Sequence, residues 1–173
     1  MSVQALPEPS SVATHTISLY VHNKPGVLVR VALVFARRAY NIESLVVSSG
    51  ASEDFSRMTI TSSGDLETLE QIIKQLAKLI DVVHATDHTD DEAYETEIAL
   101  CKLKSAIDQR THILQIAEHY NAKVVDYGAE SLVLRVFGSS EKLNAFVELL
   151  RPYGVEELVR SGKIVMARGL LET

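Results

Sequence analysis

The sequence predicts an α+β fold made of two β-α-β-β-α-β units, each a sheet covered on one face by two helices. Strand-like and helix-like hydrophobic patterns follow one another in the same order in both halves of the 173-residue chain. Both halves also contain a strand that runs through a Gly/Ser break into an amphipathic helix, at residues 58–76 and 132–150. Such an alternation is typical of an antiparallel sheet with its helices on one side.

The first unit is predicted over residues 15–87. Ile17, Leu19 and Val21 alternate with polar residues, which indicates a first strand with one buried face. A Pro-Gly loop then opens into an apolar-striped helix that we expect Asn41 to close. A second helix has Asp65 as its candidate N-cap and leucines and isoleucines along one face. The predicted order is strand 15–22, helix 26–40, strand 42–50, strand 55–63, helix 65–79 and strand 81–87.

The second unit is predicted over residues 96–173 and repeats this order. An acidic run without apolar periodicity, residues 88–95, is interpreted as the linker between the two domains. Residues 1–14 are rich in Pro and Ser and are expected to form a flexible tail. The predicted order is strand 96–104, helix 107–120, strand 123–129, strand 131–138, helix 140–151, strand 154–160 and a short strand 163–169.

Composition and charge argue against several classes of function. The net charge is −6, and no basic cluster exceeds Arg37–Arg38, so nucleic acid is not an expected partner. No apolar stretch reaches the ~20 residues of a membrane helix, and no membrane partner is expected. The first 14 residues lack the features of a signal peptide, so a cytoplasmic location is expected. The single cysteine, Cys101, lies in an apolar run and is interpreted as a buried strand residue.

The sequence offers no set of residues with the pattern of a catalytic centre. It has no nucleophile-elbow, phosphate-loop or dinucleotide-binding motif, and no catalytic residue is predicted. His84, Asp87, His88 and Asp90 are conceivable metal ligands, but a solvated acidic linker is the favoured interpretation, so no metal site is predicted. His112 and His119 could share one helix face, where a surface or packing role is the default.

The segment best suited to bind a ligand is the loop that follows the first predicted strand. The start of a helix has unpaired N–H groups and a partial positive charge, so it favours a small anion such as a carboxylate. Pro25 suits the first helical turn, and Gly26 allows a ligand to approach the backbone. The side-chain amides of Asn23 and Asn41 flank this loop, and Val27–Leu28 offer apolar contacts. The alternative is a Pro-Gly turn that merely starts a helix.

The chain resembles one known family in these residues. The segment NKPGVLVRVALVFARRAYNIESL, residues 23–45, looks like the ACT domain of the regulatory small subunit of acetohydroxyacid synthase, also called acetolactate synthase. The resemblance extends over about residues 15–169, and NIESL with SRMTI is its most specific part. It implies two ferredoxin-like domains, an N-terminal ACT domain over 15–87 and a C-terminal domain over 96–173.

The resemblance also implies a regulator without catalytic residues or cofactors of its own. Such subunits dimerise through their ACT domains, bind a branched-chain amino acid (valine, leucine or isoleucine) at the dimer interface, and activate a catalytic large subunit. Thiamine diphosphate, Mg²⁺ and FAD would belong to that large subunit. The effector-binding positions then fall on Asn23, Lys24, Pro25, Gly26, Val27, Leu28, Asn41 and Ile42, with Asn23 and Asn41 expected from opposite protomers.

Three other functions remain open at this level. The chain could be a free-standing amino-acid sensor that gates a different enzyme or a transcription factor, which co-purification would reveal. It could be an enzyme of its own, which turnover of pyruvate would reveal. It could also be a structural dimeric scaffold, which titration with amino acids would distinguish from the regulator.

Overall fold

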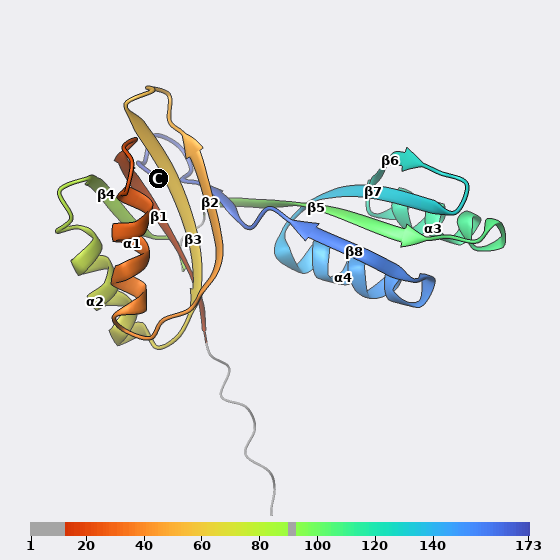
Figure 1. The fold of residues 1–173 in the computed structure, drawn as a ribbon, viewed down its shortest axis with the longest axis horizontal. Coiled ribbons are helices and arrows are strands. Elements are labelled where there is room, and N and C mark those ends of the chain that lie inside the picture. Colours follow the sequence, from red (N-terminus) through yellow and green to blue (C-terminus); the bar gives the residue numbers. More distant parts are fainter. Residues whose placement is uncertain (1–12, 90–92) are drawn as a thin grey trace, which may run out of the picture.

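The computed structural model describes residues 13–89 and 93–173, and within these ranges the strands form two antiparallel sheets with helices (Figure 1). The α+β prediction is therefore confirmed. The predicted tail falls mostly on residues 1–12, which lie outside the described residues. In the first domain the elements are β1 (Thr14–His22), α1 (Val27–Ala36), β2 (Ile42–Ser49), β3 (Phe55–Ser63), α2 (Leu66–Leu76) and β4 (Val82–Asp87).

The second domain repeats the β-α-β-β-α-β order, with one added strand. Its elements are β5 (Tyr94–Lys104), α3 (Arg110–His119), β6 (Lys123–Tyr127), β7 (Ser131–Gly138), α4 (Ser140–Leu150), β8 (Val155–Arg160) and β9 (Ile164–Met166). The sheet orders are β2-β3-β1-β4 in the first domain and β6-β7-β5-β8 in the second, and β9 pairs with β5. The two domains thus share one topology, as the repeated pattern predicted.

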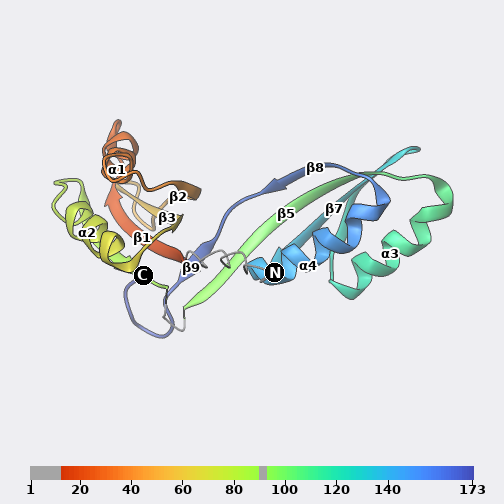
Figure 2. The same cartoon turned by 90° about the horizontal axis from the view of Figure 1, so that it is seen from below.

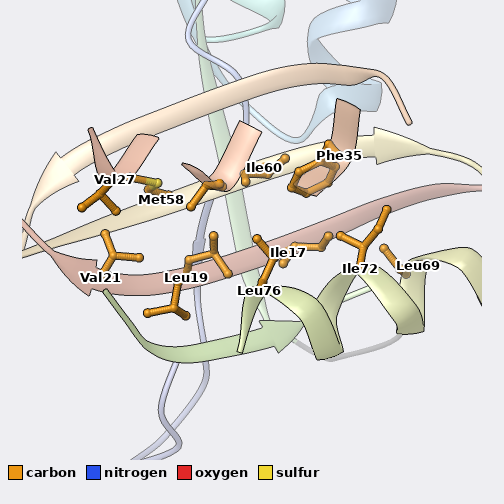
Figure 3. Close-up of a cluster of buried hydrophobic side chains, with 12 residues drawn as sticks. Ile17, Leu19, Val21, Val27, Phe35, Met58, Ile60, Leu69, Ile72 and Leu76 are labelled. Carbon is orange, nitrogen blue, oxygen red and sulfur yellow. The ribbon is translucent and has the colours of Figure 1, made fainter. Parts of the chain in front are cut away.

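One face of the first sheet is buried under the two helices. Ile17, Leu19 and Val21 of β1 are fully or almost fully buried and point toward the helices, together with Phe35 of α1 and Ile72 of α2 (Figure 3). The period-2 alternation of β1 produces this arrangement, because successive side chains point to opposite faces of a sheet. Asp65 caps α2 as predicted, and its carboxylate accepts a hydrogen bond from Thr68 N at 2.8 Å.

Helix α1 ends one turn earlier than the sequence predicts. It ends at Ala36 instead of reaching residue 40, and Asn41 does not close it. Ala39 adopts a left-handed conformation with φ 54°, and Tyr40 N donates to the carbonyl of Phe35 at 3.2 Å. This is the hydrogen bonding of a left-handed helix end. The sequence does not indicate this helix end, because the left-handed residue is alanine rather than glycine.

Some residues of the predicted linker, residues 88–95, are buried or belong to a strand. The side chain of His88 is only 2% exposed, and its Nε2 lies 2.8 Å from Ser18 Oγ. Strand β5 already begins at Tyr94. Residues 90–92 lie outside the described residues, so the described part of the predicted linker consists mainly of a buried histidine and the start of a strand.

The segment after β8, which the sequence analysis assigns to the C-terminal domain, also packs on the first domain (Figures 1 and 2). Gly162, with φ +84°, lies so close to Ser44 of β2 that an added Cβ would be 3.0 Å from that side chain. Further along, Arg57 of β3 donates a 2.6 Å hydrogen bond to the main-chain oxygen of Thr173. The segment therefore covers part of the sheet face that the helices leave open.

None of the helices in the described ranges combines the length and the apolar character that crossing a membrane requires.

We predict that the Cys101 thiol is unreactive in the folded protein. Its side chain is fully buried in β5, and burial raises the pKa of this thiol to about 11, so almost no thiolate exists at neutral pH. A soluble disulfide reagent should label the native chain slowly and the urea-unfolded chain rapidly and stoichiometrically. Rapid labelling of the native chain at neutral pH would contradict this prediction.

Candidate functional site

The loop between β1 and α1 is exposed and is tied to the neighbouring β2–β3 loop. Asn23 N donates to the carbonyl of Asp54 at 2.8 Å, and Asn23 Nδ2 donates to the carbonyl of Glu53 at 3.0 Å. Lys24 and Pro25 are exposed at the tip. The side-chain amide nitrogen of Asn23 therefore helps to hold the two loops together. Its amide oxygen is not part of that hydrogen bond and can accept one from a ligand.

Gly26 is the residue from which α1 starts, and its backbone requires glycine. Its φ is +83°, and an added Cβ would lie 3.1 Å from Arg30 Nη1. The carbonyl of Gly26 accepts the first hydrogen bond of the helix from Arg30 N at 3.1 Å. The N–H groups of Leu28 and Val29 precede that bond and have no acceptor within the helix. These groups form the anion-attracting helix start that the sequence predicts.

An ion pair between α1 and the turn before β4, which the sequence analysis missed, anchors the start of α1. Arg30 Nε and Nη2 both donate to Asp81 Oδ2, at 2.9 and 2.6 Å. Asp81 is buried, and its main-chain carbonyl accepts a 2.8 Å hydrogen bond from His22 N. The signal for this anchor is one arginine in an otherwise apolar helix segment, residues 27–36. Its partner could not be found by pattern, because Asp81 lies 51 positions further along the chain.

The predicted apolar contacts of the loop are divided between core and surface. Val27 is only 3% exposed and belongs to the core under the sheet, so its side chain does not face the loop surface. Leu28 is exposed beside it. The expectation that the side chains of Val27 and Leu28 both contact a ligand therefore needs correction. Because Val27 is buried, only Leu28 of the two is accessible to a ligand.

Asn41 and Ile42 lie far from Asn23 within one chain. Asn41 is exposed just before β2, and its main-chain oxygen accepts a 2.6 Å hydrogen bond from Ser62 Oγ. Ile42 is half-buried at the first position of β2. The ten residues of α1 separate the two amides by ~15 Å along the helix axis. The structure of one chain therefore does not place both amides beside the same loop.

Exposed apolar side chains gather next to this site, on the outer face of α1. Leu28, Val29 and Leu33 are all exposed, Val29 at 60%. Strand β2 forms an edge of its sheet, because its only neighbour in the sheet order is β3. Val47 of β2 is also exposed. Exposed apolar side chains near an open strand edge are typical of a protein interface.

Within residues 13–89 and 93–173, no group of three or more His, Cys, Asp or Glu side chains is arranged to hold a metal ion. Asp90, one of the conceivable ligands in the sequence, lies outside these residues.

Comparison with known proteins matches both domains to one family. The family model described as "AHAS small subunit-like ACT domain" matches residues 17–84, and the model described as "Small subunit of acetolactate synthase" matches residues 96–169. The chain belongs to the acetolactate synthase small-subunit family. It is thus a member of a family of regulatory subunits with an N-terminal ACT domain, as the resemblance implied.

Relatives and a solved structure of the acetolactate synthase small-subunit family extend over nearly the whole chain. A probable acetolactate synthase small subunit of Archaeoglobus fulgidus is 43% identical over 155 residues, which cover 90% of this chain and 97% of the relative. The acetolactate synthase small subunit of Mycolicibacterium smegmatis is 43% identical over 156 residues, covering 90% and 92%. The crystal structure of the small subunit from Thermotoga maritima superposes with a TM-score of 0.82 at 37% identity, covering 91% of this chain and 99% of that one.

We predict that Asp81→Ala loosens the loop and destabilises the first domain. The substitution removes a buried carboxylate that accepts two hydrogen bonds from Arg30, and half of that arginine stays in solvent. The free energy of unfolding should fall by ~1–2 kcal/mol, measured by urea denaturation. The matched control is Glu70→Ala, which breaks the exposed pair with Lys74 and should cost under about 0.5 kcal/mol. Equal losses in the two variants would contradict the anchoring role of Asp81.

Proposed function

We propose that this small subunit activates a catalytic large subunit of acetolactate synthase and makes it sensitive to feedback inhibition by a branched-chain amino acid. The observation that carries the proposal is the exposed helix start at Gly26, which lies beside Asn23 and next to the apolar edge of the first sheet. Valine, leucine and isoleucine fit its chemistry, because each joins a carboxylate to a branched apolar side chain. Under this proposal, thiamine diphosphate, Mg²⁺ and FAD are held by the large subunit.

The proposed effector site is completed by a second copy of the chain. The open edge of β2 and the exposed side chains of α1 support a dimer in which two first-domain sheets join side by side. A two-fold axis would pair the β2 strands antiparallel, so that the start of one strand lies beside the end of the other. Strand β2 starts after Asn41, and it ends at the β2–β3 loop that holds Asn23.

This pairing explains how two amides that are distant in one chain can act together. Asn23 of one protomer and Asn41 of its partner would meet across the strand pair, on either side of the helix start. The helix N–H groups near Leu28 would bind the carboxylate, and the amide oxygens would accept from the ammonium group. Leu28 would provide apolar contact to the branched side chain. One amino acid would then contact both protomers.

Binding at such an interface regulates by shifting the equilibrium between dimer arrangements. An effector that contacts both protomers favours the arrangement in which both contacts are made. The shift cannot exceed the difference in binding free energy between the two arrangements, typically ~1–3 kcal/mol in coupled systems. The large subunit would sense that shift through its contact with this chain.

We predict that Asn23→Ala and Gly26→Asp abolish amino-acid inhibition and largely preserve activation of the large subunit. The first change removes an amide of the proposed site, and the second places a negative charge and a strained residue at the helix start. Acetolactate formation by the reconstituted enzyme, measured against valine concentration, provides the test. Gln75→Ala, an exposed amide on α2, should retain full inhibition. Loss of activation and inhibition together would argue against an effector site at this loop.

We predict that Leu33→Asp dissociates the dimer. The change places a charge in the centre of the exposed apolar face of α1. Sedimentation velocity should then detect monomer at concentrations where the unaltered chain is a dimer. Leu66→Asp, at a somewhat more exposed position on α2, should leave the dimer intact. A dimer of unchanged stability in the Leu33 variant would contradict an interface at α1 and β2.

A further inference from the structure

Two main-chain hydrogen bonds hold the loop between β1 and α1 in the first domain; this arrangement is called the frame below. The last residue of β1, His22, donates its N–H to the carbonyl of Asp81 at the turn that precedes β4. The next residue, Asn23, donates to the carbonyl of Asp54 in the β2–β3 loop. Both distances are 2.8 Å. The first loop is therefore held between two other loops at one end of the sheet.

The second domain contains the same frame. The last residue of β5, Lys104, donates its N–H to the carbonyl of Gly154 before β8 at 3.0 Å. The next residue, Ser105, donates to the carbonyl of Glu130 in the β6–β7 loop at 2.9 Å. The loop that leads from β5 into α3 thus occupies the position that the Asn23 loop has in the first domain.

An open pocket of about 820 Å³ lies at this second loop. All three loops of the frame contribute to its lining. Its lining includes both signs of charge: Lys104 at the end of β5, and Glu130 and Glu156 on the two segments that flank it. Ile107, which is 82% exposed, and Pro152 add apolar surface. A volume of this size is within the range of pockets for small molecules.

A buried arginine, Arg110, lies directly behind this loop; its guanidinium carbon lies 4.7 Å from the centre of the Tyr127 ring, and no carboxylate of residues 13–89 or 93–173 forms an ion pair with it. Arg110 is only 8% exposed, and its Nη2 donates to the carbonyls of Gly128 at 2.8 Å and Ala129 at 2.5 Å. A longer contact, 3.4 Å, reaches the carbonyl of Ser105. Its Nε has no hydrogen-bond partner in the part of the chain that the structure describes. Ser105 and Ala129 also line the pocket, so this positive charge stands immediately behind the pocket wall.

The contrast with the first domain suggests what the pocket can bind. There, Asp81 neutralises the arginine behind the loop, whereas the hydrogen bonds described for Arg110 lead to neutral carbonyls. A buried charge that is not neutralised raises the local positive potential and favours an anionic group nearby. The two glutamates in the lining of the pocket favour a cationic group.

We propose that this pocket is a second ligand site, which binds a free α-amino acid with a compact apolar side chain. The carboxylate lies at the Ser105–Ile107 loop near Lys104 and Arg110, and the ammonium group faces Glu130 and Glu156. The proposal does not require a ligand at the Asn23 loop. It assigns to the C-terminal domain a binding role of its own, on a frame that both domains share.

The test is a titration of the ¹⁵N-labelled full chain with L-valine and L-leucine, followed by NMR. We expect amide resonances of residues 104–107, 128–130 and 152–156 to shift with saturation. Lys104→Glu should weaken this binding about tenfold, the effect of losing one charge-assisted contact. Ala106→Trp, which fills the pocket without a change in charge, should abolish it. Isovalerate, which lacks the ammonium group, should bind more weakly than valine.

The matched control is Lys123→Glu, the same charge change on exposed β6 outside the pocket, and it should leave the affinity unchanged. Asn23→Ala should also leave these shifts intact, which separates this site from the loop of the first domain. Failure of the proposed function would appear as unmoved resonances around residues 23–28 alone. Unmoved resonances around residues 104–107 in the unaltered chain, or equal loss in the Lys123 variant, would overturn the second site.

Discussion

In each domain, two helices must bury the apolar face of one antiparallel sheet, and most other features follow from that requirement. Alternating strands such as β1, with Ile17 and Leu19 pointing inward, have only one face for the helices to cover. The opposite face and the outer strands stay uncovered. The loop from strand to helix must emerge at one end of the sheet. The interdomain contact uses surface that helix packing leaves open, and the proposed ligand site and dimer edge would use more of it.

The contact between the domains uses the open sheet face. The first residues of β5 pair with β9, and the strand then continues into the second sheet (Figure 2). One strand therefore takes part in the β9 pairing and in the second sheet. The segment after β9 reaches β3, where Arg57 holds the main-chain oxygen of Thr173. His88 is buried against Ser18 on the same face. The first sheet and the C-terminal segment are therefore in direct contact.

The two domains show how one backbone frame can serve different electrostatic arrangements. Both hold their strand-to-helix loop by paired main-chain hydrogen bonds to the two neighbouring loops. Behind the first loop, Arg30 is neutralised by Asp81, and the exposed helix start supplies the positive potential. Behind the second, Arg110 donates to carbonyl oxygens instead of to a carboxylate. Topology places the loop in each case, and one or two side chains decide which chemistry it supports.

The sequence determined by itself the α+β class, the order of the elements, the buried faces and the loop at Gly26, because strand and helix periodicities and turn residues are local signals. The sequence also predicted Asp65 as the N-cap of α2. Only the tertiary structure decided the end of α1 at Ala36, the Arg30–Asp81 anchor and the burial of His88. Each depends on a backbone conformation or a partner distant in the chain, for which no local pattern exists. The separation of Asn23 from Asn41, by contrast, already followed from the helix predicted between them.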